Sequence, residues 1–521
     1  MNVLFCTQSE SLQLFDALRS ALSQRLPIEQ AGFTVADSQA YGRWLAQRPR
    51  YESEGHLVLK EWDVTAAHHG QPNLEKLAAY EQVLGGAAGL FGAIVADRRL
   101  FMGPDCTYSQ DYRRRFTDDQ LLCMLQRGLE DMERLFDTLK PDVRVSFICV
   151  TILDYLAYLF ATARGVRVLN LRPTRVGDRI GFSSRLNDPS PEFAASYTRI
   201  LDSGESEHLP QAQAYIRRVR EQHGRYEGVV RPSDRPALKA NTARLTRLGG
   251  LLTAARNYLT YRGSIAAQDN HVPDPLRALW FTAVRNPRRA KEARRQLAPS
   301  YVKADRLPTL RYVFFPLHTE PEVSLLVYGR PYVNQIEIIR MLAISLPVDC
   351  VLVVKEHPWM VGKRTPVAYA KMLNIPRVHL ADPSLEARTL IQHAALVAVV
   401  TGSVALEAAM LGKPVITFGD CPYNLLPDHM VRRCDDPRRL QLIMREALQP
   451  HPSDDRAMEA YVAAVYDTTA SINLYSVLLA KKNVHVERVG NYAEEIDKLA
   501  ALVQHELSMN VAPDHPQAAA W

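Results

Sequence analysis

The sequence predicts an α/β fold with two Rossmann-like domains that face a cleft. Two regions alternate short apolar runs, typical of buried parallel strands, with segments of helical periodicity. Between these regions the sequence becomes polar and rich in arginine. We predict four parts: a first Rossmann-like domain over 1–205, a basic helical insertion over 206–305, a second Rossmann-like domain over 306–450, and helices over 451–521 that brace the two domains.

Composition fits a globular protein with more than one core. The chain has 521 residues, of which 47% are hydrophobic and 23% charged. Its seven cysteines are scattered singly with no C-x-x-C pair, which favours a reducing cytoplasm and argues against structural zinc. No basic leader or long apolar run stands out, so we expect a cytoplasmic chain that does not span a membrane.

The first domain is predicted from seven elements. Apolar runs predict strands, and Leu-rich periodic segments between polar caps and Gly or Pro stops predict helices. In chain order we expect a strand at 3–6, a helix at 12–22, a strand at 92–97, a helix at 118–139, a strand at 143–150, a helix at 154–164 and a strand at 166–171. The last three form a β-α-β unit.

The insertion is the most basic part of the chain. Residues 211–300 carry 18 Lys/Arg and 6 Asp/Glu, and helical segments are expected at 212–222 and 242–260. Such a surface suits either packing on a neighbouring domain or contact of residues 240–296 with a membrane surface. Because the segment has no recognisable nucleic-acid motif, we expect no nucleic-acid partner.

The second domain is predicted in the same way. Strands are expected at 312–315, 350–354, 378–380, 396–400 and 415–418, and helices at 335–346 and 403–410. Beyond the domain, helices are expected at 455–482 and 492–508. All of these strands are short and apolar, as parallel strands covered on both faces are.

Two strand ends in this domain carry residues that suit a ligand. The strand at 350–354 leads into Lys-Glu-His-Pro at 355–358, and the strand at 396–400 leads into Thr-Gly-Ser at 401–403, which opens a helix. Ligands of open parallel sheets bind at such ends. The helix start favours an anion, and Gly402 lets that anion approach the backbone, so we predict a phosphate site here.

These residues also have a structural interpretation. A serine at a helix start is commonly a cap that contributes about 1 kcal/mol, and a strand-end histidine is commonly packed or solvated. The combination of the serine and the histidine on successive strand ends favours a ligand site over these structural interpretations. The predicted nucleotide-binding residues are Lys355, His357, Pro358, Thr401, Gly402, Ser403 and Glu407, with Arg364 as a further phosphate candidate.

The second half resembles the capsule polysaccharide biosynthesis family. The matching motifs are FFPLHTEPEVS at 314–324, KEHP at 355–358 and TGSVALEAAMLGKPVITFG at 401–419. The resemblance implies a GT-B glycosyltransferase fold, with His357 and Pro358 on the nucleotide of a donor such as CMP-Kdo and Thr401 and Ser403 on its phosphate. It implies no cofactor beyond the nucleotide-sugar, and no Asp-x-Asp metal element stands out.

The first half departs from that pattern. Kdo transferases of this type carry an acidic element after a strand of the first domain, where this chain has LRPTRVGDRIGF at 171–182. Arg172 and Arg175 stand in its place and are predicted to bind an anionic acceptor or a donor carboxylate. The remaining candidates for the reaction are Asp178 as general base, His318 and Glu320 at the crevice, and Glu322, Asp97 and Asp105 as further carboxylates.

Together these features predict a cytoplasmic glycosyltransferase, with a peripheral position at the inner membrane as a further expectation. It would transfer Kdo or a related acidic sugar to a surface polysaccharide or its lipid-linked primer. Two alternatives stay open: a nucleotide-sugar epimerase or hydrolase of GT-B-like fold, and a non-catalytic capsule-assembly protein that keeps the fold.

Overall fold

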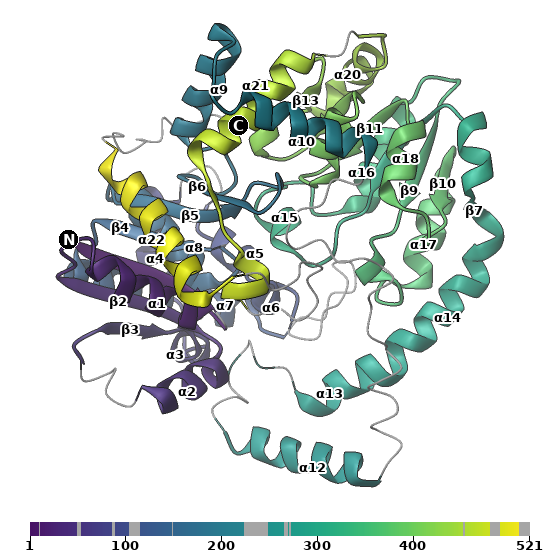
Figure 1. Cartoon of the computed structure of the whole chain (residues 1–521). Helices are drawn as coiled ribbons and strands as arrows, with labels where there is room; N and C mark the ends of the chain where they lie inside the picture. Colours follow the sequence, from purple (N-terminus) through teal and green to yellow (C-terminus); the bar gives the residue numbers. More distant parts are fainter. Residues whose placement is uncertain are drawn as a thin grey trace.

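Figure 1 shows the chain as a computed structural model. The structure describes residues 1–9, 11–48, 54–85, 89–103, 115–147, 149–222, 248–264, 269, 272, 274–451, 454–479 and 490–509. Two seven-stranded sheets form the centres of two α/β halves.

The first sheet has a Rossmann-like centre. Its strand order is β14-β6-β5-β4-β1-β2-β3. The strands from β5 to β3 are parallel, whereas β6 pairs antiparallel with both β5 and β14. The strands are β1 (Asn2–Gln8), β2 (Gln30–Ala36), β3 (Leu57–Lys60), β4 (Val143–Ser146), β5 (Arg167–Pro173), β6 (Arg179–Ser183) and β14 (Ala470–Ser471). The order reverses between β1 and β4, which makes that point a crevice at the strand ends.

The second sheet is fully parallel. Its order is β13-β12-β11-β8-β9-β10-β7, and chain order reverses between β8 and β11. The strands are β7 (Tyr301–Val302), β8 (Tyr312–Pro316), β9 (Val351–Lys355), β10 (Val378–Ala381), β11 (Leu396–Val399), β12 (Val415–Thr417) and β13 (Val431–Arg433). The predicted fold class, two Rossmann-like α/β domains, is confirmed.

Helices cover both faces of the first sheet. They are α1 (Ser11–Ser23), α2 (Ser38–Gln47), α3 (Glu61–Ala66), α4 (Leu74–Leu84), α5 (Gly92–Ala96), α6 (Arg98–Phe101), α7 (Asp118–Leu139) and α8 (Ile152–Ala163). One core packs β1 against α7 and α8, and another packs the opposite face against α1. Helix α7 has its predicted bounds because Thr117 and Gln120 form a capping box and Lys140 adopts a left-handed conformation.

The second sheet is covered in the same way. Its helices are α15 (Val323–Leu326), α16 (Gln335–Ser345), α17 (Pro366–Leu373), α18 (Ala387–His393), α19 (Val404–Met410) and α20 (Leu440–Ala447). Helices α16, α17 and α20 lie in one core with the sheet, and α18 and α19 lie in the other.

Four further helices pack on the two halves. Helices α9 (Pro191–Ser203), α10 (Leu209–Glu221) and α21 (Asp455–Thr468) pack in the core of the second half, and α22 (Tyr492–Ser508) packs beside α1 in the first. The rings of Phe193 and Tyr461 lie 5.1 Å apart and join α9 to α21. The predicted domain boundaries stay predictions, but α9, placed before residue 205, packs on the second half.

A row of helices, which we call the arm, runs along the outside of the molecule. It consists of α12 (Leu248–Arg262), α13 (Pro275–Trp280), a π-helical turn (Phe281–Arg285) and α14 (Asn286–Leu297). Figure 1 shows α12 and α13 below the two sheets and α14 rising along the second half.

Three predicted elements were wrong. The strand expected at 92–97 is instead the short helix α5 at 92–96, because a five-residue apolar run does not distinguish the two states. The strand expected at 143–150 ends at Ser146. The helix expected at 455–482 ends at Thr468, since β14 follows and pairs with β6; its last residues lie outside the described part.

Candidate active site

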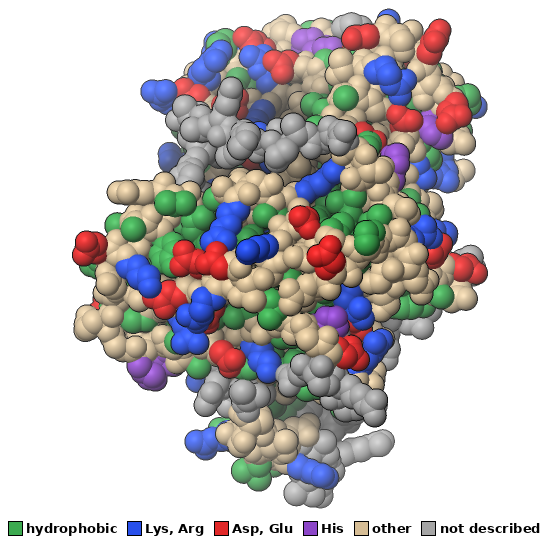
Figure 2. All heavy atoms as spheres, turned by 90° about the vertical axis from the view of Figure 1, so that its left-hand side faces the viewer, with side chains coloured by type: hydrophobic (Ala, Val, Ile, Leu, Met, Phe, Trp, Pro, Cys, Tyr) green, Lys and Arg blue, Asp and Glu red, His purple; other side chains and the backbone are tan. Residues whose placement is uncertain are grey.

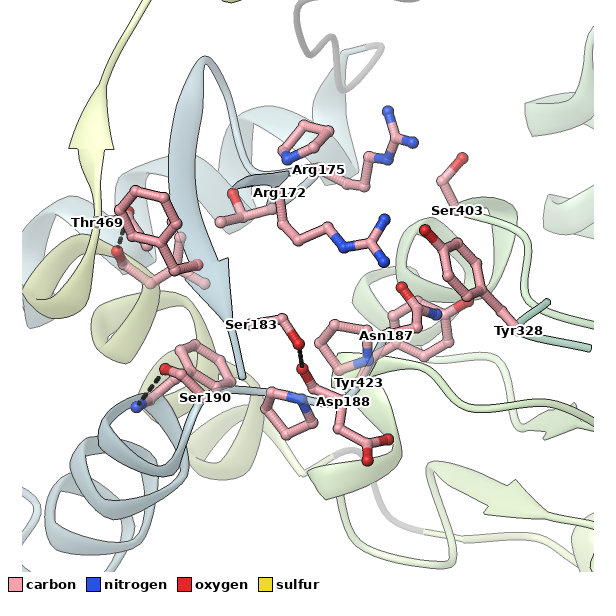
Figure 3. Close-up of a pocket in the computed structure, with 18 of the residues that line it drawn as sticks. Arg172, Arg175, Ser183, Asn187, Asp188, Ser190, Tyr328, Ser403, Tyr423 and Thr469 are labelled. Carbon is pink, nitrogen blue, oxygen red and sulfur yellow. Dashed lines mark hydrogen bonds between the residues drawn. The ribbon is translucent and has the colours of Figure 1, made fainter. Parts of the chain in front are cut away.

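A cavity of about 250 Å³ lies between the two halves. The first half contributes Arg172, Arg175 and the loop from Ser183 to Ser190, whereas the second half contributes Glu322, Tyr328, Thr401, Ser403 and Tyr423. Figure 3 shows Arg172 and Arg175 extending from one wall toward Ser403 and Tyr328 on the other. The cavity therefore brings residues from both Rossmann-like halves together.

The tight hairpin from β5 to β6 positions the two arginines. Thr174 accepts a hydrogen bond from Val176 N at 3.2 Å and donates one to Arg179 O at 3.0 Å. Arg175 adopts φ 69° and Gly177 φ 57° within the turn. Because both arginines sit at the strand end, they present two positive charges to the same cavity.

Arg172 contacts the opposite wall directly. Its Cζ atom lies 4.4 Å from the centre of the Tyr328 ring, a cation–π contact between the halves. Burial raises the pKa of Tyr328 to about 12, although Arg172 opposes that shift, so the phenol stays protonated at neutral pH.

Glu322 provides a carboxylate on this surface. Ser324 Oγ donates to Glu322 Oε2 at 2.9 Å, and Arg98 of the first half holds the preceding carbonyl of Pro321 at 3.1 Å. The Glu322 side chain meets solvent in the cavity, yet partial desolvation by the surrounding protein raises the pKa of its carboxyl, while Ser324, Arg175 and Arg98 oppose the shift. A raised pKa makes the carboxylate a stronger base, so Glu322 can accept a proton from a ligand in the cavity.

A second carboxylate, Asp188, also lines the cavity. It lies 3.6 Å from Arg185 Nη1, and Figure 3 shows its carboxylate pointing away from Arg172 and Arg175. Neither Asp188 nor Tyr328 was predicted as a site residue. The sequence signal for Tyr328 was its position four residues after the FFPLHTEPEVS motif.

His318 lies at the point where the order of the second sheet reverses. Thr401 N donates to His318 Nε2 at 3.4 Å, which joins the ends of β8 and β11. Burial, with a contribution from His357, lowers the pKa of His318 to about 4, so the ring is neutral at pH 7 and carries its proton on Nδ1. A Cβ on Gly402 would lie 3.2 Å from His318 Cε1, which explains the glycine.

The loop at 401–403 is held from several sides. Thr401 Oγ1 donates to Ser324 O at 3.0 Å, and the Tyr423 hydroxyl donates to Gly402 O at 2.8 Å. Ser403 precedes the seven-residue helix α19 and makes no side-chain cap to it. Thr401 and Ser403 both line the cavity, as a ligand-binding loop at a strand end would.

Other predicted nucleotide-binding residues lie behind this wall. His357 Nδ1 accepts from Trp359 N at 3.2 Å and so caps the turn that Pro358 begins. Lys355 Nζ donates to the carbonyl of Pro383 at 3.4 Å, and Glu407 lies 4.0 Å from Arg388. The residues that line the cavity do not include Lys355, His357, Pro358 or Glu407.

Glu320 belongs to a buried network. Arg364 Nη1 donates to Glu320 Oε1 at 2.9 Å and Arg364 Nε to Glu356 Oε2 at 2.7 Å, while the Tyr369 hydroxyl donates to the same Glu356 oxygen at 2.7 Å. Glu320 is only 2% exposed. The predicted catalytic role of Glu320 and phosphate role of Arg364 do not fit this placement, because each is enclosed with its partners.

Asp178, the predicted general base, lies on the β5–β6 turn. Its carboxylate accepts a hydrogen bond from Ser471 Oγ and its carbonyl accepts one from Ile472 N at 3.1 Å, so it fastens β14 rather than lining the cavity. Asp97 is buried and caps α6. Asp105 lies outside the described residues.

Within the described part of the chain, no group of three or more His, Cys, Asp and Glu side chains is placed to hold a metal ion. Among the described helices, none combines the length and apolar character needed to cross a bilayer.

Two solved structures show distant similarity to this chain. The β-Kdo 2,4 transferase of KpsC from Thermosulfurimonas dismutans is 15% identical with a TM-score of 0.33, covering 62% of this chain and 79% of that one. The UDP-GlcNAc 2-epimerase from Neisseria meningitidis is 10% identical with a TM-score of 0.27, covering 97% and 99%. At these scores the fold assignment rests on the strand order described above.

Sequence comparison is more specific. Protein FixF of Sinorhizobium fredii is 29% identical over 164 residues, which are 30% of this chain and 37% of that protein, so the match spans little more than a third of the relative. A family model for capsule polysaccharide biosynthesis protein matches residues 256–426. All three motifs noted in the sequence fall inside this segment, and the predicted resemblance is confirmed: residues 256–426 carry the pattern of the capsule polysaccharide biosynthesis family.

Proposed function

We propose that the protein is a glycosyltransferase of surface polysaccharide synthesis. It moves a sugar from a nucleotide-activated donor to a polysaccharide or its lipid-linked primer. The observation that carries the proposal is the cavity between the two halves. Arg172 and Arg175 of one wall extend toward Ser403 of the other, and the carboxylate of Glu322 lines the same cavity. The family match of residues 256–426 supports it.

In this proposal the donor lies between the walls. The 401–403 loop, at the carboxyl end of β11, receives the nucleotide phosphate from one side. Arg172 and Arg175 bind negatively charged oxygens from the other side, as guanidinium groups bind phosphate and carboxylate. A CMP-linked acidic sugar such as CMP-Kdo, which has both groups, is the donor class that this arrangement suits.

The Glu322 carboxylate takes the role of general base. It accepts the proton of the acceptor hydroxyl while that oxygen forms a bond to the anomeric carbon. The bond from this carbon to the donor phosphate oxygen breaks, and its electron pair leaves with the nucleotide. The two arginines stabilise the negative charge that develops on the leaving phosphate.

Thermal unfolding with CMP, UDP, GDP and their sugars tests the donor site. We expect one nucleotide to stabilise the native protein, by about 2.7 kcal/mol at a hundredfold excess over its Kd. Arg175→Gln and Ser403→Ala should reduce this shift, whereas Arg438→Gln, whose side chain is 90% exposed, should not.

The products then distinguish the reaction classes. Transfer of labelled sugar to a polysaccharide or glycolipid primer supports the proposal. Release of free sugar without any transfer would indicate a hydrolase, and interconversion of the donor sugar an epimerase. Absence of any nucleotide-dependent stabilisation would contradict a donor site and favour a non-catalytic assembly protein.

A further inference from the structure

The arm combines exposed apolar side chains with a high positive charge. The exposed fractions of its three largest exposed hydrophobic side chains are 70% for Leu259, 41% for Leu276 and 53% for Trp280. Leu276 and Trp280 are four residues apart on α13 and therefore share one face. An exposed aromatic and aliphatic pair of this kind has no role in the core.

Two sets of contacts among the described residues fix the arm to the body. Ala293 and Leu297 of α14 enter the core of the second half, and Arg289 donates to Lys363 O at 3.4 Å. Before α13, the buried Asp269 accepts a hydrogen bond from Ser38 N of the first half at 2.5 Å. Helix α12 packs on α13, and α13 itself has no buried residue.

The charge of the arm is strongly one-sided. Residues 248–297, which span the arm, contain nine Lys/Arg and three Asp/Glu. Asp269 is buried and Asp274 caps α13, so two of the three acids have structural roles. The basic side chains Arg277, Arg288, Lys291, Arg294 and Arg295 are exposed. Figure 2 shows basic and hydrophobic side chains at the lower end of the molecule, where Figure 1 places α12.

We propose that the arm docks on an anionic lipid bilayer. Trp280 and Leu276 would enter the boundary between headgroups and acyl chains, while the arginines bind the lipid phosphates and their aliphatic stems cover the apolar surface. This pairing of tryptophan with arginine matches the layered polarity of a bilayer surface. The inference is independent of the reaction proposed above.

Vesicle flotation of the full chain tests the proposal. We expect binding to vesicles of mixed phosphatidylcholine and phosphatidylglycerol, little binding to phosphatidylcholine alone, and loss of binding at high salt. Arg288→Gln and Arg295→Gln should each weaken partitioning about fivefold. Trp280→Ser combined with Leu276→Ser should weaken it at least as much, because the apolar anchor is lost.

Helix α20 supplies matched controls. Leu442 is 49% exposed and Arg445 is exposed on the same helix, so Leu442→Ser and Arg445→Gln change similar surface elsewhere and should leave binding intact. Equal loss in these controls, or equal binding to both vesicle types, would overturn the proposal. The proposal would also be overturned if every arm variant still bound vesicles but no longer bound duplex DNA. That result would indicate that the arm is a nucleic-acid surface.

Discussion

At the residue scale, two glutamates separated by one proline have opposite environments. Glu320 is enclosed beside Arg364, whereas Glu322 lines the cavity. Both lie in the motif FFPLHTEPEVS. Their environments differ because the chain after β8 places one side chain inside the domain and the other at the cavity. Of these two glutamates, Glu322 is therefore the one whose carboxylate a ligand in the cavity can reach.

Replacement of this carboxylate gives the first prediction. Glu322→Gln should lower kcat about 10²–10⁴-fold with little loss of nucleotide-induced stabilisation. Because the base must be ionised and partial desolvation by the cavity walls raises its pKa, kcat/KM of the native protein should fall as pH drops through a value above the ordinary 4.5. Asp178→Asn should stay close to native activity; an inactive Asp178→Asn with an active Glu322→Gln would restore Asp178 as the base.

His318 gives a prediction for stability against pH. Its pKa is about 4 in the folded protein and 6.5 ordinarily, so between these values the unfolded chain binds the additional proton. The free energy of unfolding should therefore decrease as pH falls from about 6.5 to 4, by an amount on the order of 3 kcal/mol from this group.

Urea denaturation at a series of pH values measures this dependence. His318→Gln keeps an acceptor for Thr401 N but does not titrate, so its stability should fall less steeply over the same range. The matched control is His393→Gln, which replaces an exposed histidine. An unchanged slope in His318→Gln would show that His318 is protonated equally in both states.

At the element scale, the network around Arg364 joins the loops that follow β8 and β9. Arg364 holds Glu320 of the first loop and Glu356 of the second, and Glu356 Oε1 accepts from His357 N at 2.7 Å. His318 then links β8 to the loop after β11. Three successive strand ends are thus positioned by a chain of buried polar contacts.

Arg364→Met tests this linkage. Since it leaves two buried carboxylates without their cation, we expect a loss of about 3–5 kcal/mol in the free energy of unfolding. Arg340→Met breaks an exposed pair with Glu337 at 2.8 Å and should cost less than about 1 kcal/mol. Urea denaturation compares the two, and equal losses would contradict a structural role for the buried network.

Elements were predictable where local signals were strong. The bounds of α7 and α22 match the prediction because capping residues and helical periodicity are local properties. The prediction failed at α5 and beyond Thr468, where the state of a short apolar segment depends on the neighbour it meets. The two-residue strand β14 exists only because β6 lies beside it.

At the scale of the whole molecule, the two halves are tied together around the cavity. Tyr328 of the second half belongs to a hydrophobic core of the first and stacks on Arg172. Arg330 donates to Gly92 O at 2.7 Å close by. The segment after Glu322 therefore links the carboxylate that we propose as base to the wall that carries the arginines.

The sequence by itself determined the two Rossmann-like halves, the glycine-containing loop at 401–403 and the basic character of the arm, because these follow from periodicity, capping and composition along the chain. Tertiary structure alone decided which polar groups share a cavity. Arg172 and Glu322 are far apart in the chain, and their common environment depends on how two sheets face each other. Burial likewise separated Glu320 from Glu322, since whether a carboxylate meets solvent or a buried arginine is a property of the folded molecule.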